Sequence, residues 1–216
     1  AGTGTAPSVA DYVDAGITGV TTSNLAATNT AVKASTGDIT TDPDTVIATA
    51  ASSGVTAQST ALTKIVDYAT NGTTAPTVDD YTNAGITGVT ATNLVAINSR
   101  VDAAAAADVN TLTLAQAVVN TGIVANSAAI SAIKDYLTDS VNNAAPTLAT
   151  YKDANLVSTI TTAEQLSNAN YLLSKVLAGQ TLTNTAIGTA LGDQVTAFAK
   201  IDDYAAVGGS ANAPTA

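Results

Sequence analysis

The chain of 216 residues carries a formal net charge of −10 and contains no cysteine, histidine, methionine or tryptophan. Disulfides, zinc–thiolate sites and imidazole chemistry are therefore excluded within it. With only seven basic residues, the chain also lacks the positive surface that binding to nucleic acid or to anionic lipid requires.

A motif of Ala-Pro followed by Ser or Thr recurs along the chain with a period of about 70 residues. Its prolines, Pro7, Pro76, Pro146 and Pro214, lie 69, 70 and 68 residues apart. This period predicts a linker at 1–6, helical repeats at 7–75, 76–145 and 146–213, and the start of a further repeat at 214–216. We therefore expect the sequence to be part of a longer array.

Four helices are predicted in the first repeat, and capping and turn residues set their limits. Pro7 stands near the start of a short leading helix, and Gly16 supplies the left-handed residue that ends it. The other limits are Thr21 as N-cap of the second helix, Asp42-Pro43 and Gly54 as start and stop of the third, and the apolar stripe with Leu62 and Ile65 in the fourth.

The second repeat follows the same order. Asp79 and Asp80 lie at the positive end of the leading helix, 76–84, and Gly85 ends it. The other predicted helices are 91–106 after an N-cap at Thr90, a third from Thr111 or Thr113 to just before Gly122, and a fourth at 125–138.

The third repeat departs from the other two where its leading helix ends. Asn155 replaces the glycine there, and asparagine is the next best residue for a left-handed conformation. Thr161 is the predicted cap of the next helix, and the later stops are Gly179, Gly192 and Gly208-Gly209.

These patterns predict an all-α protein, a tandem array of three small helical bundles, each with three main helices and a short leading helix. Strands are the alternative, because Thr and Val are frequent and residues 16–20 alternate in polarity. Ala-rich stretches such as 103–107 favour the helical interpretation. No run of about 18 apolar residues is present, so we expect no membrane-spanning helix. No signal-peptide pattern is present either, and we expect any targeting signal to lie outside this sequence.

Tyrosines recur at two positions of the repeat. Tyr12, Tyr81 and Tyr151 follow the prolines, whereas Tyr68, Tyr136 and Tyr204 close the predicted fourth helices. A tyrosine can bury its ring and keep its hydroxyl at the rim of a core. We therefore expect these tyrosines and the four prolines to form core and repeat-boundary contacts. A ladder that binds sugars or peptides is the alternative.

Acidic residues offer one weak metal candidate, Asp38, Asp42 and Asp44, because calcium prefers carboxylate oxygens. Their spacing does not match a calcium-binding loop, so we expect a polar loop with Asp42 as a helix cap and no bound metal. The neighbouring pairs Asp79-Asp80 and Asp202-Asp203 do not predict a catalytic dyad, since adjacent helical residues point about 100° apart. We expect no enzymatic activity and no cofactor.

The segment from Pro76 to Leu94 contains the phrase Asp-Tyr-Thr-Asn-Ala-Gly-Ile-Thr-Gly-Val-Thr, and it matches residues 7–25 strongly and 146–166 weakly. This phrase resembles the helical tandem-repeat regions of very large secreted bacterial surface proteins, adhesins related to the repeats-in-toxin type. The resemblance implies export to the bacterial cell surface and a spacer or adhesive role without catalytic residues. The calcium-binding nonapeptide of that family does not occur in this sequence.

The expected function is therefore that of a structural spacer or adhesive module that holds a binding region away from the cell. The alternative is a self-assembling subunit of an extracellular filament or surface layer, with head-to-tail docking of its termini. The expected partners are neighbouring repeats, copies of the same chain, or a host or abiotic surface. Nucleic acid and direct membrane insertion are not expected.

Overall fold

The structure is a computed structural model that describes residues 5–35, 43–156, 160, 162–177 and 184–206. Within these residues the regular elements are helices and no strand occurs. The chain divides into two compact units, Ala1–Ile123 and Val124–Ala216. The all-α prediction is confirmed.

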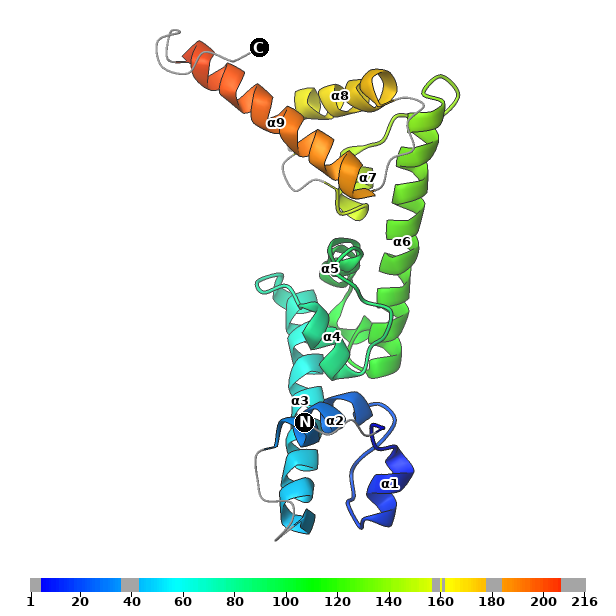
Figure 1. Ribbon diagram of the computed structural model, residues 1–216, viewed down its shortest axis with the longest axis vertical. Helices are drawn as coiled ribbons and strands as arrows, with labels where there is room; N and C mark the ends of the chain where they lie inside the picture. The colour runs from blue at the N-terminus through cyan, green and yellow to red at the C-terminus, as the bar shows by residue number, and fades with distance from the viewer. Residues whose placement is uncertain (1–4, 36–42, 157–159, 161, 178–183, 207–216) are drawn as a thin grey trace. The chain divides into compact units, whose positions relative to one another are not determined.

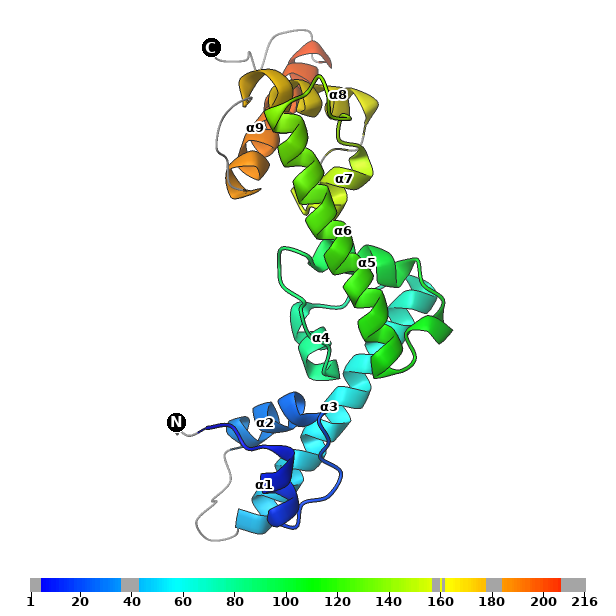
Figure 2. The same cartoon turned by 90° about the vertical axis from the view of Figure 1, so that its right-hand side faces the viewer.

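Unit 1 consists of short helices packed on long ones. Its elements are α1 (Val9–Asp14), α2 (Leu25–Ala34), α3 (Pro43–Asn71), α4 (Val78–Ala84), α5 (Leu94–Asp102), the 3-10 turn η1 (Ala106–Asp108) and the first part of α6 (Leu112–Thr138). Figures 1 and 2 show α2 beside the N-terminal half of α3, and α4 beside its C-terminal half.

Unit 2 begins within α6 and has the same alternation of short and long helices. It contains the rest of α6, α7 (Leu148–Asp153), α8 (Ala163–Tyr171), the π-helical turn η2 (Leu172–Val176) and α9 (Asn184–Ala206).

The leading helices α1, α4 and α7 begin with the same capping arrangement. Ser8 and Thr77 accept the backbone N–H of Asp11 and Asp80, whose carboxylates accept the backbone N–H of the capping residue in return. Thr147 and Thr150 form the equivalent box at α7. Each leading helix is followed by a left-handed residue, as predicted: Gly16 (φ 75°), Gly85 (φ 85°) and Asn155 (φ 54°).

The predicted caps of the second helices, Thr21 and Thr90, are wrong. Asn24 and Asn93 are buried, and their side-chain oxygens accept the backbone N–H of Thr21 and Thr90 at 2.8 Å. The same amides donate to the carbonyls of Gly19 and Gly88 at 2.9 Å. These bonds hold a tight loop, so α2 and α5 begin after the asparagines. Thr161 lies outside the described residues, and α8 is capped by its neighbour Thr162.

The predicted third and fourth helices of each repeat are one continuous helix, so a repeat does not have three main helices. α3 spans 29 residues and α6 spans 27. Gly54 and Gly122 are therefore not helix stops. A Cβ added at Gly54 would lie 2.3 Å from the Cα of Thr28, and one at Gly122 would lie 2.6 Å from the Cα of Ile97. These glycines allow a second helix to cross closely.

The prediction that a helix stops at Gly192 is wrong as well, because this glycine lies inside α9. Gly179 and the pair at 208–209 lie outside the described residues.

Buried side chains form three hydrophobic cores that do not follow the boundaries of the sequence repeats. The first core is Tyr12, Ile17, Val20 and Ala51. The second is Ala61, Ile65, Tyr81, Ala84, Ile86, Ile97, Val101, Val109, Ala115 and Val119. The third is Ala129, Ile133, Leu137, Tyr151, Ala154, Ile160, Ala169, Leu173, Leu177, Ile187 and Leu191. Thus α3 and α6 each contribute their two halves to successive cores.

Candidate functional site: the junctions between repeats

The tyrosine of each leading helix forms the same hydrogen-bonded relay in all three repeats. The hydroxyl of Tyr81 donates to Oδ1 of Asn98 at 2.7 Å, and Nδ2 of Asn98 donates to the carbonyl of Pro76 at 2.9 Å. The other two relays are Tyr12–Asn29–Pro7, with distances of 2.7 and 2.9 Å, and Tyr151–Asn170–Pro146, with distances of 2.8 and 3.0 Å. Each relay ties the start of a repeat to its second helix.

Burial raises the pKa of each relay tyrosine, most strongly for Tyr81 and Tyr151 and in the same direction for Tyr12. The phenols therefore stay neutral and serve as donors. The tyrosines and prolines were predicted as structural positions, but the asparagines were missed. Their signal was an Asn 17 residues after the tyrosine in the first two repeats and 19 residues after it in the third.

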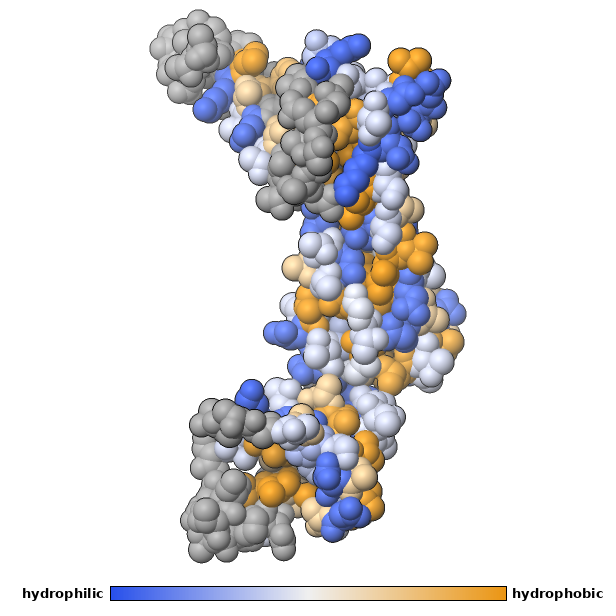
Figure 3. Space-filling model, turned by 45° about the vertical axis from the view of Figure 1, so that its right-hand side comes forward, coloured by the Kyte–Doolittle hydropathy of each residue, from blue (hydrophilic) through white to orange (hydrophobic). Residues whose placement is uncertain are grey.

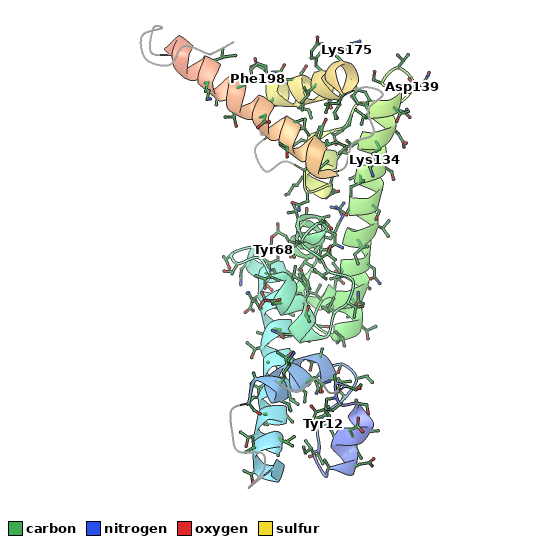
Figure 4. All side chains as sticks on the ribbon, viewed as in Figure 1. Tyr12, Tyr68, Lys134, Asp139, Lys175 and Phe198 are labelled. Carbon is green, nitrogen blue, oxygen red and sulfur yellow. The ribbon has the colours of Figure 1, made fainter. Side chains whose placement is uncertain are left out.

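The boundary prolines differ in burial. Pro76 and Pro146 are buried, whereas Pro7 is exposed, and Pro214 lies outside the described residues. Of the closing tyrosines, Tyr68 packs against the second core and Tyr136 against the third. Figure 4 labels Tyr12 and Tyr68 on their helices. The side chain of Tyr204 lies outside the described ones.

The first junction is the contact of the C-terminal half of α3 with α4 and α5. Its buried apolar residues from α3 are Ala61 and Ile65, which belong to the same core as Tyr81. Ile65 is fully buried, with an exposed fraction of 0%. An isoleucine of the first sequence repeat thus completes the core of the second repeat.

Polar contacts reinforce the first junction. Lys64 forms an ion pair with Asp80, with 2.5 Å between Nζ and Oδ2. Burial raises the pKa of Asp80, but its hydrogen bonds from Lys64 and Thr77 outweigh burial and hold that pKa below its ordinary value. Gln58 of α3 donates to the carbonyls of Ser23 and Ala84 at 3.4 and 3.3 Å.

The chain after α4 also approaches the preceding repeat very closely. A Cβ added at Gly85 would lie 2.1 Å from the carbonyl oxygen of Ser23. Glycine is therefore needed at this position for its left-handed backbone and also for the space that it leaves.

The second junction, between the C-terminal half of α6 and α7, has the same apolar contacts but a different polar contact. Ala129 and Ile133 are buried in the core of Tyr151. Nδ2 of Asn126 donates to the carbonyl of Asp153 at 2.7 Å, in place of the Gln58 contacts. The sequence has Ala132 and Thr150 at the positions of Lys64 and Asp80, so the ion pair belongs to the first junction.

The C-terminal half of α9 carries the same pattern, but two of the described positions that are buried at the junctions are exposed here. Ala197 is exposed, and Ile201 is 47% exposed, although Ile65 and Ile133 at the same repeat position are fully buried. Phe198, labelled in Figure 4, is half-buried. Figure 3 shows hydrophobic residues, in orange, interspersed with hydrophilic ones, in blue, on the face of the molecule that it draws.

Two shallow grooves lie along α3. The first has a volume of about 390 Å³ and lies between α2 and α3, lined by Ala31, Ala34, Ser35, Thr45, Val46, Thr49, Ala50 and Ser53. The second, about 360 Å³, follows the first junction along Ser53, Thr56, Ala57, Thr60, Ala61, Lys64, Asp80 and Asn83. In the second groove the two charged side chains, Lys64 and Asp80, form an ion pair with each other.

Of the acidic candidates, only Asp79 and Asp80 have side chains within the described part of the chain. Asp80 is occupied by its capping box and its ion pair, which agrees with the structural interpretation of Asp79-Asp80. No group of three or more acidic side chains placed to hold a metal occurs among the residues that the structure describes. Asp38 and Asp42 and the side chains of Asp44, Asp202 and Asp203 lie outside the description.

By length and average composition, α6 is apolar enough to cross a membrane. The sequence did not single out this helix, because it contains no uninterrupted run of apolar residues and α6 has polar residues within it. Five of its residues, Ala115, Val119, Ala129, Ile133 and Leu137, are buried in two different protein cores. Its length is accounted for by its contribution to both cores.

Comparisons with models of known protein families, with characterised proteins and with solved structures find no match to this chain.

Proposed function

We propose that this chain is a structural spacer of a secreted bacterial surface protein, in which repeated short helices are joined through long helices that two successive cores share. The contribution of α3 to both the first and the second core carries this proposal. A helix shared by two cores couples them without a flexible linker, which suits a protein whose role is to span distance. The resemblance of residues 76–94 to adhesin repeats supplies the expected location.

The spacer proposal predicts a fixed gain in length for each added repeat. Chains with one, two or three extra copies of residues 76–145 would be compared by small-angle scattering at low concentration. The maximum dimension should grow by a constant increment. A plateau, or a radius that grows as for a flexible coil, would contradict the proposal.

The surface location calls for a separate experiment. An antibody raised against the chain should label intact producing cells, and protease added outside those cells should remove the label. Labelling that appears only after permeabilisation would contradict secretion.

A second candidate function is that of a self-assembling subunit of an extracellular filament or surface layer. The exposed positions Ala197 and Ile201 favour it, because their counterparts are covered by a following repeat at both internal junctions. The strongly negative net charge opposes unspecific association, so assembly would need a specific contact.

A further inference from the structure

The C-terminal half of α9 repeats the half of α3 that is covered at the first junction. Residues 60–65 read Thr-Ala-Leu-Thr-Lys-Ile, and residues 196–201 read Thr-Ala-Phe-Ala-Lys-Ile. In α3 the alanine and isoleucine of this segment are buried, whereas in α9 both are exposed. We call Ala197, Phe198, Lys200 and Ile201 the tail face.

The first repeat exposes the surface that would cover such a face. Ala84 and Ala154, in the second and third repeats, are buried, but their counterpart Ala15 is exposed. A Cβ at Gly85 would meet the preceding repeat, whereas one at Gly16 meets nothing within 4 Å. We call Pro7, Asp11, Ala15 and Gly16 the head face, and all four are exposed while their counterparts at the first junction are partly or fully buried.

The two faces carry opposite charges at the positions that form the ion pair of the first junction. Lys200 stands at the position of Lys64, and Asp11 at the position of Asp80, whose side chains form the ion pair of that junction. Both Lys200 and Asp11 are exposed. Asp11 already has the orientation of Asp80, since Ser8 holds it in the same capping box as Thr77 holds Asp80.

The second junction shows that this charge pair is not a general property of the repeats. It has an alanine and a threonine at these two positions. The tail face and the head face therefore carry the charged residues of the first junction, which has the ion pair, and not the uncharged residues of the second.

We propose that the tail face of one copy docks on the head face of a second copy and reproduces the contacts of the first junction. In the docked pair Ile201 joins the core that contains Tyr12, and Lys200 pairs with Asp11. This site rests on the second proposed function and names its contact. Because the two faces are different surfaces, the contact is heterologous and adds copies in series unless a ring closes.

Sedimentation velocity of the whole chain over a concentration series tests the proposal. The monomer has a mass of 21.2 kDa, and we expect discrete larger species that increase with concentration. The variant Ile201→Asp should remain monomeric, because it places a charge in the docked core. The matched control, Val141→Asp, changes a residue that is 90% exposed and on neither face, so it should associate like the unchanged chain.

Charge reversal provides a sharper experiment. Lys200→Glu and Asp11→Lys should each weaken association about fivefold or more, because each places like charges in the contact. A mixture of the two variants should recover association, since every contact between unlike variants then pairs opposite charges. Circular dichroism confirms that each variant keeps its helices, which is expected for substitutions at exposed positions.

Two other results would contradict docking of the tail face on the head face. Association that persists in Ile201→Asp would overturn docking through the tail face and leave self-assembly standing. A chain that stays monomeric at every concentration would overturn both docking and self-assembly, and it would assign the tail face to a covalently following repeat. The spacer proposal has its own test in the length of extended chains.

Discussion

The first and second cores are built from the same order of elements but are buried to different extents. The second core receives the C-terminal half of α3, which brings Ile65 against the leading helix α4 and its tyrosine. Among the described residues, the first core has no such preceding helix, and its Pro7 and Ala15 are exposed. The comparison teaches that a repeat is completed by the long helix of the repeat before it.

The two cores also differ where the long helix crosses the second helix. The second core has Ile97 at this crossing, whereas the first has Thr28, whose buried hydroxyl has no hydrogen-bond partner in the described structure. The first core therefore leaves one polar group unsatisfied where the second gains apolar contact.

The largest expected effect comes from removing the side chain that the first junction buries. Ile65→Ala should lower the free energy of unfolding by about 2–5 kcal/mol, because it leaves a cavity in the second core. Ile201→Ala, at the exposed counterpart, should change it by less than about 0.5 kcal/mol in dilute solution. Urea unfolding followed by circular dichroism measures both, and equal losses would contradict the difference between covered and open faces.

Two glycines of the long helices should respond in opposite ways to substitution by alanine, because only one of them lies where a second helix crosses. Gly54→Ala should destabilise the chain by about 1–3 kcal/mol, because the new methyl group meets the backbone of α2. Gly192 has nothing within 4 Å of an added Cβ, so Gly192→Ala should stabilise α9 by about 0.5–1 kcal/mol. Opposite shifts of the unfolding midpoint are expected, and a loss of stability in both variants would refute this explanation.

The relays of Tyr81 and Tyr12 should respond differently to loss of their asparagine. Asn98→Ala leaves the buried hydroxyl of Tyr81 and the carbonyl of buried Pro76 without partners, at a cost of about 1–3 kcal/mol. Asn29→Ala should cost less, because Pro7 is exposed and its carbonyl can bind water. Thermal unfolding of the two variants tests this order, and the reverse order would show that burial does not set the strength of the relay.

Thr28→Val should raise stability by about 1 kcal/mol, because it replaces an unsatisfied buried hydroxyl with a methyl group of similar shape. Thr30→Val is the control, since the exposed hydroxyl of Thr30 donates to the carbonyl of Ala26 and stays accessible to water. A loss of stability in Thr28→Val would indicate that a bound water satisfies this group.

The smallest expected effect concerns the ion pair of the first junction. The pKa of Asp80 lies below its ordinary value in the folded state, so its contribution to stability is present above a pH of about 4 and is lost as the pH falls further through the folded pKa. Both side chains are partly exposed, at 35% for Lys64 and 20% for Asp80, which limits the contribution to less than about 1 kcal/mol.

The stability difference between the unchanged chain and Asp80→Asn should therefore vanish in acid. Asp79→Asn, in the same helical turn but outside the ion pair, provides the control. A difference that stays constant from neutral pH to below a pH of about 3 would rule out the titration of Asp80 as its source.

The local features of this fold were predictable because short-range chemistry decides them. Gly16, Gly85 and Asn155 end the leading helices in a left-handed conformation, and few other residues adopt that conformation readily. The tyrosines of the leading helices, Tyr12, Tyr81 and Tyr151, likewise marked buried positions, since an aromatic ring at a fixed place in each repeat has to pack against something.

The errors arose where one residue type serves two purposes. Glycine can end a helix, and it can also let two helices cross closely. Gly54 and Gly122 serve the second purpose, which is evident only from their contacts with the distant residues Thr28 and Ile97. The relay asparagines were missed for a similar reason, because their partners lie 17 to 24 residues away. The open face of α9 could not be predicted either, since the sequence of a buried segment and of its exposed copy is nearly the same.

Sharing a helix between two cores also affects the order in which the chain can fold. The polar contacts of the first junction join residues separated by at most 35 positions, and the relays by fewer. Low separation between contacting residues favours rapid folding. The second core joins residues from Ala61 to Val119, so a chain that emerges from one end, as during synthesis, can close this core once about one repeat of sequence has followed Ala61. The long helix that ends the core then presents its second half, on which the next core assembles.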